Sequence, residues 1–332
     1  MNRTSSIRRN ILGIAAAAAL LLTAPVLTAQ AGDKWDMPAG YSAKNFITAT
    51  YIEFAEAVTK NSNGALEVVV HPSGSLYKAS EILRAVRSGQ VPIGARYIGA
   101  HASEDPIFGI DTVPFLATDA DQAWKLYQAS KPALEAALDK RGMKLLFTAV
   151  WPPQGLFAKK PVNSVADMQG VKFRAYDAGT TRLAQLMGSV PTKTEATEIG
   201  QAFSTGVAES MIASGAIGVF RKMWDYVDHF YTVNAWLPKS VVVVNKDAWT
   251  KLDDATKKVV MDAALAAEKS VWAAMKATND GYNKTMADNG ITVSAPSDKL
   301  RMDLEKIGQT MSEEWAASSG QTAQDIIKAY NK

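Results

Sequence analysis

The sequence predicts an α/β protein of two lobes, each with a mainly parallel sheet and flanking helices, and one long helix that spans both. Strand patterns alternate with helical patterns along most of the chain, an order that is typical of parallel sheets. Two prolines and a glycine interrupt the chain at Trp151–Gly155. A helical pattern without proline runs over about 253–289. At ~1.5 Å per residue it extends on the order of 50 Å, longer than one lobe is wide.

Residues 1–31 have the composition of a bacterial export signal. Three arginines come first, an apolar run follows, and Ala29-Gln30-Ala31 matches a small-x-small cleavage site. We therefore expect a mature chain that starts near Gly32, is exported by general secretion and is soluble in the periplasm. Twin-arginine export and a retained N-terminal anchor are the alternatives.

The charge of the expected mature chain is balanced. Of the 36 Lys and Arg residues, three lie in the leader, so 33 basic residues face 33 acidic ones. Nucleic acid and anionic membrane surfaces both attract a basic face, so neither is expected as a partner. The chain has no Cys, which excludes a thiol nucleophile and a cysteine metal site.

The first half of the chain alternates strands with helices. Expected strands lie at 35–41, 66–70, 91–97 and 145–150, and expected helices at 45–59, 80–88, from 119 onward and at 132–141. The apolar run Val241–Val244 indicates a central strand that returns to this lobe later in the chain. We therefore assign 32–153 and 240–280 to lobe I.

A second α/β unit follows the interruption by the prolines. Expected strands lie at 171–176, 189–192 and 208–212, with expected helices at 178–187 and 196–205 and a turn at 214–218. We assign 154–239 and 281–332 to lobe II, with closing helices at 300–315 and 322–330. The long helix bridges the two lobes.

Arg174 ends one of the short strands of the second unit. The alternation of apolar and polar residues across 171–176 buries one face of the strand and directs Arg174 to the other. A guanidinium in this position can pair bidentately with a carboxylate. A ligand carboxylate is one candidate partner, and an internal salt bridge is the alternative.

Aromatic residues recur where strands give way to loops. In an open parallel sheet, ligands bind at such an edge, although aromatic residues also fill cores. The residues at these positions are Tyr41, Tyr97, Trp151, Tyr176 and Trp236. The predicted ligand-binding set also includes Gln154, in the proline interruption, and Ser214, in the turn after a strand.

Motifs of common enzyme classes are absent from the sequence. It contains no Gly-x-Ser-x-Gly elbow, no P-loop and no Gly-x-Gly-x-x-Gly after a strand. The histidines are scattered, with neither metal-ligand spacing nor a paired nucleophile; they are His71, His101 and His229. We therefore expect a binding protein with no cofactor and no metal, rather than an enzyme.

Three segments resemble, in order and spacing, the substrate-binding subunits of tripartite ATP-independent periplasmic (TRAP) transporters, the DctP family. They are Asp111–Leu116, Ser164–Arg174 and Glu198-x-x-x-Ala202-Phe203-x-x-Gly206-Val207. The resemblance implies a class II-like periplasmic binding protein that holds its ligand between two lobes. It also implies delivery to the small and large membrane permease subunits, with Arg174 gripping the ligand carboxylate.

The resemblance also bears on the ligand. Family members that bind sialic acid have three further polar contacts, and Phe157, Ala213 and Trp236 stand at those positions here. This implies a less polar ligand, a monocarboxylate with an apolar or aromatic body, contacted by Tyr97, Trp151, Phe157 and Trp236. Members that place a metal beside a keto acid have an acidic residue near Met211-Ile212, and neither residue here is acidic.

Several alternatives stay open from the sequence. A periplasmic sensor would share the same cleft, and an enzyme acting on an organic acid would need a general base near Arg174, which we do not find. Lactate-like, 2-oxo, aromatic and dicarboxylic acids all remain candidate ligands. We expect a monomer whose lobes close by hinge motion near Pro152-Pro153 and Lys239-Ser240.

Overall fold

The computed structural model describes residues 33–332, which form three sheets in two lobes, each lobe with its own helices. The export signal predicted at 1–31 lies outside the described residues. The first lobe contains a two-stranded sheet, β1-β2, and a three-stranded sheet in the order β3-β10-β4, and one isolated parallel bridge links Ala39, just after β1, to Ala95 of β3. Its strands are β1 (Asp33–Pro38), β2 (Leu66–His71), β3 (Ile93–Tyr97), β4 (Met143–Val150) and β10 (Lys239–Asn245).

The second lobe contains a sheet of six strands in the order β11-β9-β5-β8-β6-β7. These strands are β5 (Gln154–Ala158), β6 (Lys172–Ala175), β7 (Val190–Lys193), β8 (Ser210–Ser214), β9 (His229–Tyr231) and β11 (Thr292–Ser294). Strand β6 pairs in parallel with β7 and β8, which fixes Arg174 opposite Thr192 and Met211.

One strand in each lobe runs against the others. Strand β10 is antiparallel to β3 and β4, and strand β5 is antiparallel to β8 and β9. Both reversed strands begin directly after the chain crosses between lobes: β5 follows β4 through Trp151-Pro152-Pro153, and β10 follows β9 through 232–238. The expected two-lobed α/β fold is confirmed, with mixed sheets in which the strands of each lobe are mainly parallel and one strand is reversed.

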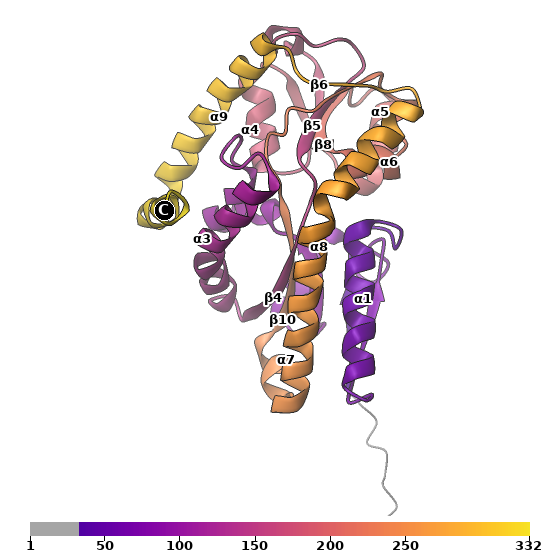
Figure 1. Cartoon of the computed structure of the whole chain (residues 1–332), viewed down its shortest axis with the longest axis vertical. Helices are drawn as coiled ribbons and strands as arrows, with labels where there is room; N and C mark the ends of the chain where they lie inside the picture. The colour runs from indigo at the N-terminus through magenta and orange to yellow at the C-terminus, as the bar shows by residue number, and fades with distance from the viewer. Residues whose placement is uncertain (1–32) are drawn as a thin grey trace, which may run out of the picture. The chain divides into compact units, whose positions relative to one another are not determined.

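Helices cover the faces of both sheets (Figure 1). Those of the first lobe are α1 (Phe46–Asn61), α2 (Ile82–Arg87), α3 (Ala120–Asp139) and α7 (Lys246–Lys251), and those of the second are α4 (Ala178–Leu186), α5 (Ile199–Ser204) and α6 (Gly215–Phe220). Short 3₁₀ segments connect them at η1 (Ala79–Glu81), η2 (Ile98–His101), η3 (Pro106–Thr112), η4 (Val165–Met168), η5 (Ala196–Glu198) and η6 (Met223–Asp225). Three further helices complete the chain, α8 (Asp254–Asp288), α9 (Asp298–Ser319) and α10 (Gln321–Tyr330).

The predicted long helix is confirmed as α8. It packs on α1 and β4 in the first lobe and on α6 and β11 in the second (Figure 1). Asp253 caps its start by accepting a hydrogen bond from the Thr256 amide. Buried Val260 and Met286 lie near its two ends, so one helix contributes to the cores of both lobes.

Helix α9 also spans both lobes. Leu300 and Leu304 near its start join the second-lobe core, whereas the Trp315 indole near its end donates to the Pro106 carbonyl at 2.9 Å in the first lobe. The following helix α10 packs on α3, and its Ala323 and Ile326 join the first-lobe core. The boundaries predicted from the sequence assign 281–332 to lobe II, because the sequence does not show which sheet an amphipathic helix covers, whereas α10 and the end of α9 pack on the first lobe.

Helix α3 differs from the expected pair of helices at 119 onward and 132–141. The structure has one helix with Pro132 inside it. Proline removes one backbone hydrogen bond, which usually ends a helix. Here the apolar stripe continues on both sides of it, from Leu126 to Leu138, and its burial in the first-lobe core keeps the two halves in line.

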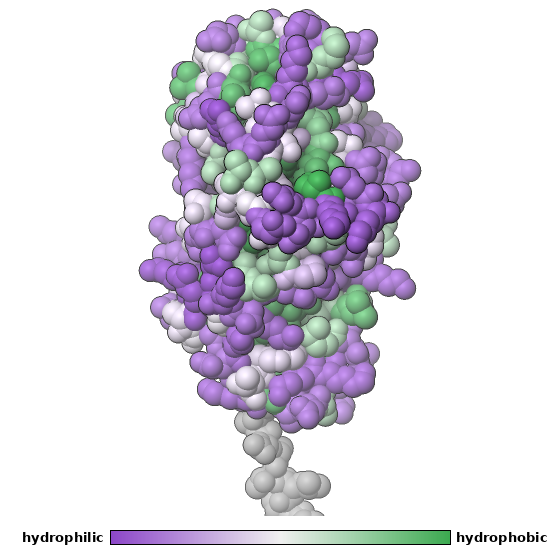
Figure 2. Space-filling model, turned by 90° about the vertical axis from the view of Figure 1, so that its left-hand side faces the viewer, coloured by the Kyte–Doolittle hydropathy of each residue, from purple (hydrophilic) through white to green (hydrophobic). Residues whose placement is uncertain are grey.

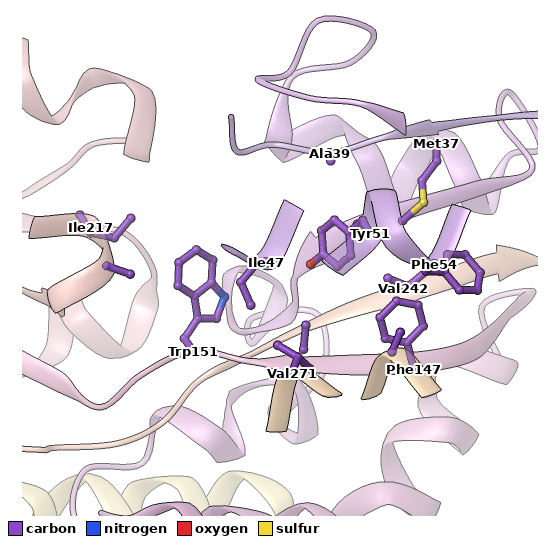
Figure 3. Packing of buried hydrophobic residues seen from close by; sticks show 14 of the residues in the cluster. Met37, Ala39, Ile47, Tyr51, Phe54, Phe147, Trp151, Ile217, Val242 and Val271 are labelled. Atoms are coloured by element: carbon purple, nitrogen blue, oxygen red, sulfur yellow. The ribbon is translucent and has the colours of Figure 1, made fainter. Parts of the chain in front are cut away.

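The first-lobe core continues up to the crossing between the lobes. Figure 3 shows Tyr51, Phe54 and Phe147 packed together, with Trp151 further along toward Ile217 of the second lobe. The surface face in Figure 2 is mostly hydrophilic, with apolar residues in small separate patches. Among residues 33–332, no helix has both the length and the apolar character needed to cross a membrane.

Candidate ligand-binding site

A small cavity of about 50 Å³ lies where the two lobes meet. Its volume suits a ligand of few atoms, since a single water molecule needs roughly 10–15 Å³ of such space. Its lining comes from strands β3 and β6, from the segment Trp151–Pro153 that crosses between the lobes, and from the end of β8. It is lined by Tyr41, Arg96, Tyr97, Trp151, Gln154, Arg174, Tyr176, Glu195, Ala196, Ala213, Ser214, Ile217 and Pro238.

Arg174 is buried on β6 with only 3% of its surface exposed. Its Nε donates to the Thr194 carbonyl at 3.0 Å, and its guanidinium carbon lies 4.9 Å from the centroid of the Tyr176 ring. It forms no ion pair with a residue in the described range. Burial lowers the pKa of Arg174 from its ordinary value, yet arginine stays charged in proteins. A buried cation with terminal N–H groups left over can bind a carboxylate strongly.

Two phenols and one carboxylate surround this guanidinium. The Tyr97 hydroxyl donates to Asp177 at 2.5 Å, and the Tyr97 and Tyr176 rings meet edge to face at 5.7 Å. Asp177 also caps α4 by accepting from the amide and hydroxyl of Thr180. Burial raises the pKa of both tyrosines well above 10, so both keep their protons. The hydrogen bonds of the Asp177 side chain therefore come from Tyr97 and Thr180, and its charge acts on Arg174 without forming an ion pair.

Aromatic and aliphatic groups form another part of the cavity lining. The Trp151 indole donates to the Ser240 hydroxyl at 3.0 Å, which fixes its ring, and the Tyr41 ring packs edge-on at 4.7 Å. Figure 3 shows Trp151 between Ile47 of the core and Ile217. This side is rigid because it continues the first-lobe core.

Several polar atoms around the cavity are buried without a protein partner. They are the Tyr176 hydroxyl, the Ser214 hydroxyl and the Arg96 Nε. Burial of an unpaired donor is costly, and such groups in native structures call for a specific explanation. Together with the Arg174 guanidinium they provide donors for the oxygen atoms of a small anion.

Comparisons with known proteins identify the family of this chain. The model of the bacterial extracellular solute-binding proteins of family 7, DctP, matches residues 40–319. The chain belongs to this family. The predicted resemblance to TRAP solute receptors, proteins of the periplasm, is therefore confirmed, and the binding class that the sequence favoured over an enzyme is the class of this family.

Solved structures also match this receptor along nearly its whole length. DctP6 of Bordetella pertussis, an extracytoplasmic solute receptor binding pyroglutamic acid, is 40% identical, with 90% of this chain and 99% of that chain covered and a TM-score of 0.88. A marine metagenome TRAP protein specific for pyroglutamate is also 40% identical, with the same coverage and a TM-score of 0.89. The C4-dicarboxylate-binding protein DctP of Rhodobacter capsulatus is 27% identical over 86% of each chain.

The receptor brings most of the predicted ligand-binding residues together. Seven of them line the cavity, namely Tyr41, Tyr97, Trp151, Gln154, Arg174, Tyr176 and Ser214. Phe157 and Trp236 are not among the lining residues. Phe157 packs on Phe230 at 4.4 Å between ring centroids, and Trp236 lies in the second-lobe core.

Arg96 and Glu195 line the cavity but were not predicted. Arg96 lies on β3 beside Tyr97, and Glu195 precedes η5 in the second lobe; one Arg96 nitrogen lies 3.7 Å from a Glu195 oxygen. One sequence signal was available for Arg96, because it is the single charged residue in the strand Ile93–Tyr97. Glu195 carries no comparable signal, since an acidic residue before a helical turn is ordinarily a cap.

Proposed function

We propose that the protein is a periplasmic receptor for a compact cyclic monocarboxylate of the pyroglutamate type, which it delivers to a TRAP membrane permease. The observation that carries this proposal is the buried Arg174 guanidinium, which lines the cavity and pairs with no carboxylate of the described chain. A ligand carboxylate would provide the charge-assisted partner that such a group ordinarily has.

The size and the polarity of the cavity support a small ring-shaped acid. A volume of about 50 Å³ favours a ligand well below the size of a sugar acid. Trp151, Ile217 and Tyr41 can contact the ring, whereas the Ser214 and Tyr176 hydroxyls can donate to its carbonyl oxygen. Pyroglutamate combines one carboxylate, one ring carbonyl and one ring N–H. The two pyroglutamate receptors at 40% identity support the same choice.

Isothermal titration calorimetry with ligand-free mature protein tests this proposal. Pyroglutamate should bind, whereas 2-pyrrolidone, the same lactam without its carboxylate, should bind at least ~10-fold more weakly, because a hydrogen bond to a charged group contributes about 1.5–3 kcal/mol. Lactate, pyruvate and succinate complete the panel. Equal binding of pyroglutamate and 2-pyrrolidone would contradict the role of Arg174, and binding of none of the acids would contradict the proposed ligand class.

A further inference from the structure

The charges that line the cavity add up to a single uncompensated cation. Arg174 has no ion-pair partner among the described residues, whereas Arg96 has one in Glu195. Asp177, the other acidic group nearby, is not a lining residue and accepts its hydrogen bonds from Tyr97 and Thr180. One net positive charge complements one carboxylate, because a second buried carboxylate would lack a free counter-charge.

We infer that Glu195 restricts this receptor to monocarboxylates by occupying Arg96, and that without Glu195 the cavity accepts a dicarboxylate between Arg174 and Arg96. This inference rests on the proposed function, because it specifies the charge of the ligand for the same cavity. It assigns to Glu195 a specificity role based on repulsion of the wrong ligand.

The geometry of Arg96 suits it to bind the second carboxylate of a dicarboxylate. Its side chain is 7% exposed on β3, and its Nε is buried without a partner. The contact with Glu195 is loose, at 3.7 Å, so it does not use the full set of five N–H donors. A neutral ring carbonyl can therefore share Arg96 with Glu195, whereas a second carboxylate would meet the negative charge of Glu195 at close range.

Glu195 lies at the edge of the cavity rather than deep within it. Its side chain is 38% exposed, and it lines both the cavity and an adjoining pocket of about 230 Å³ together with Arg96 and Tyr41. The neighbouring Glu198 is already engaged, since its carboxylate accepts from the Glu195 amide at 3.1 Å. The Glu195 and Glu198 side chains form a capping box at the start of η5. Glu195→Gln keeps an oxygen that can accept at this cap, so it removes the charge beside Arg96 with little change to the start of η5.

The experiment compares pyroglutamate with glutarate, a five-carbon diacid whose second carboxylate takes the place of the ring carbonyl. Calorimetry on the full mature chain should give wild-type binding of glutarate at least ~10-fold weaker than that of pyroglutamate. In Glu195→Gln the ratio of the two dissociation constants should shift at least ~10-fold toward glutarate. Adding Arg96→Gln to this variant should abolish the gain, because the second cation is then gone.

Controls separate the inference from the proposed function. Glu198→Gln should leave the ratio unchanged, and Glu195→Ala provides a second neutral variant in case Glu195→Gln does not fold. The inference alone would be overturned if wild type binds pyroglutamate but Glu195→Gln and Glu195→Ala have the same ratio of dissociation constants for pyroglutamate and glutarate as wild type. It would also be overturned if wild type binds both acids equally. Wild type that binds no monocarboxylate would overturn the proposed function and the inference together.

Discussion

Two buried cations of this receptor have opposite environments. Lys239 is 2% exposed, forms an ion pair with buried Asp111 and lies 5.2 Å from the centroid of the Tyr127 ring. Arg174 is 3% exposed and has a backbone carbonyl and a phenol ring, but no carboxylate in the described part of the chain. Since buried charges are ordinarily paired, the contrast separates a cation that holds the fold from one available to a ligand.

The largest expected effect on the free energy of unfolding concerns Lys239, the cation that is paired with Asp111. Asp111→Asn leaves Lys239 buried without a counter-charge, which should lower the free energy of unfolding by about 3–5 kcal/mol. Urea unfolding followed by circular dichroism measures the loss. Burial raises the pKa of Asp111, so the measurement belongs at neutral pH or above, where the wild-type carboxylate is ionised.

A double variant tests whether charge is the cause. Asp111→Asn with Lys239→Gln places two neutral amides where the pair was, so it should be clearly more stable than Asp111→Asn alone. A double variant as unstable as the single one would show that shape, rather than charge, explains the loss.

A smaller effect on the free energy of unfolding is expected at Asp177, the carboxylate near Arg174. Tyr97→Phe removes the hydrogen bond to Asp177 and leaves one carboxylate oxygen buried without that donor. The free energy of unfolding should fall by about 1–3 kcal/mol. Tyr41→Phe is the matched control, because the Tyr41 hydroxyl has no hydrogen bond to a residue within 33–332, and it should change stability by less than ~0.5 kcal/mol. Equal losses in both variants would show that Asp177 does not depend on Tyr97.

The smallest expected effect involves His101, which is partly buried and neutral at pH 7. His101 lies in a separate part of the first lobe, with its Nδ1 2.6 Å from Glu104 and its Nε2 buried without a partner. Burial lowers the pKa of His101 below 6.5, so its contribution to stability is present above pH 6.5 and is lost as the pH falls through the folded-state value. The loss between pH 7.5 and 5.5 should therefore be smaller in His101→Gln.

The measured quantity for His101 is the difference between variant and wild type. Asp111 and Asp177 have raised pKa values and change stability in the opposite direction, favouring the folded state as the pH falls. Their contribution is common to both proteins and cancels. An identical pH dependence in wild type and His101→Gln would contradict the assignment.

Much of the fold could be predicted from periodicity alone. The long helix was expected at about 253–289 and is found at Asp254–Asp288, because caps and an uninterrupted stripe are local signals. The return of Val241–Val244 to the first sheet also follows from a local signal, an apolar run buried on both faces. The lobe covered by α10 depends on packing between distant segments, which local patterns do not specify.

The sequence predicts which residues lie at the ends of strands, but not the direction in which each side chain points. A strand end indicates how near a residue lies to the sheet edge, which suffices for Arg174, Tyr97 and Trp151. Which way a side chain turns depends on its neighbours, so Phe157 and Trp236 pack into cores. Arg96 and Glu195 belong to different lobes, and their side chains lie 3.7 Å apart only in the folded protein. The sequence of either segment therefore does not indicate that the two charges meet.

The most direct test of the central claim is the free energy of unfolding of wild type and Arg174→Gln, each with and without pyroglutamate at 100 times the wild-type dissociation constant. The account predicts that the ligand stabilises wild type by about 2.7 kcal/mol and the variant by about 1.4 kcal/mol or less, because the variant binds at least ~10-fold more weakly. It also predicts that the ligand-free variant loses far less stability than Asp111→Asn. Equal stabilisation of both proteins by the ligand would contradict the claim that Arg174 binds it. A loss of about 3–5 kcal/mol in ligand-free Arg174→Gln would show that Arg174 stabilises the fold as Lys239 does.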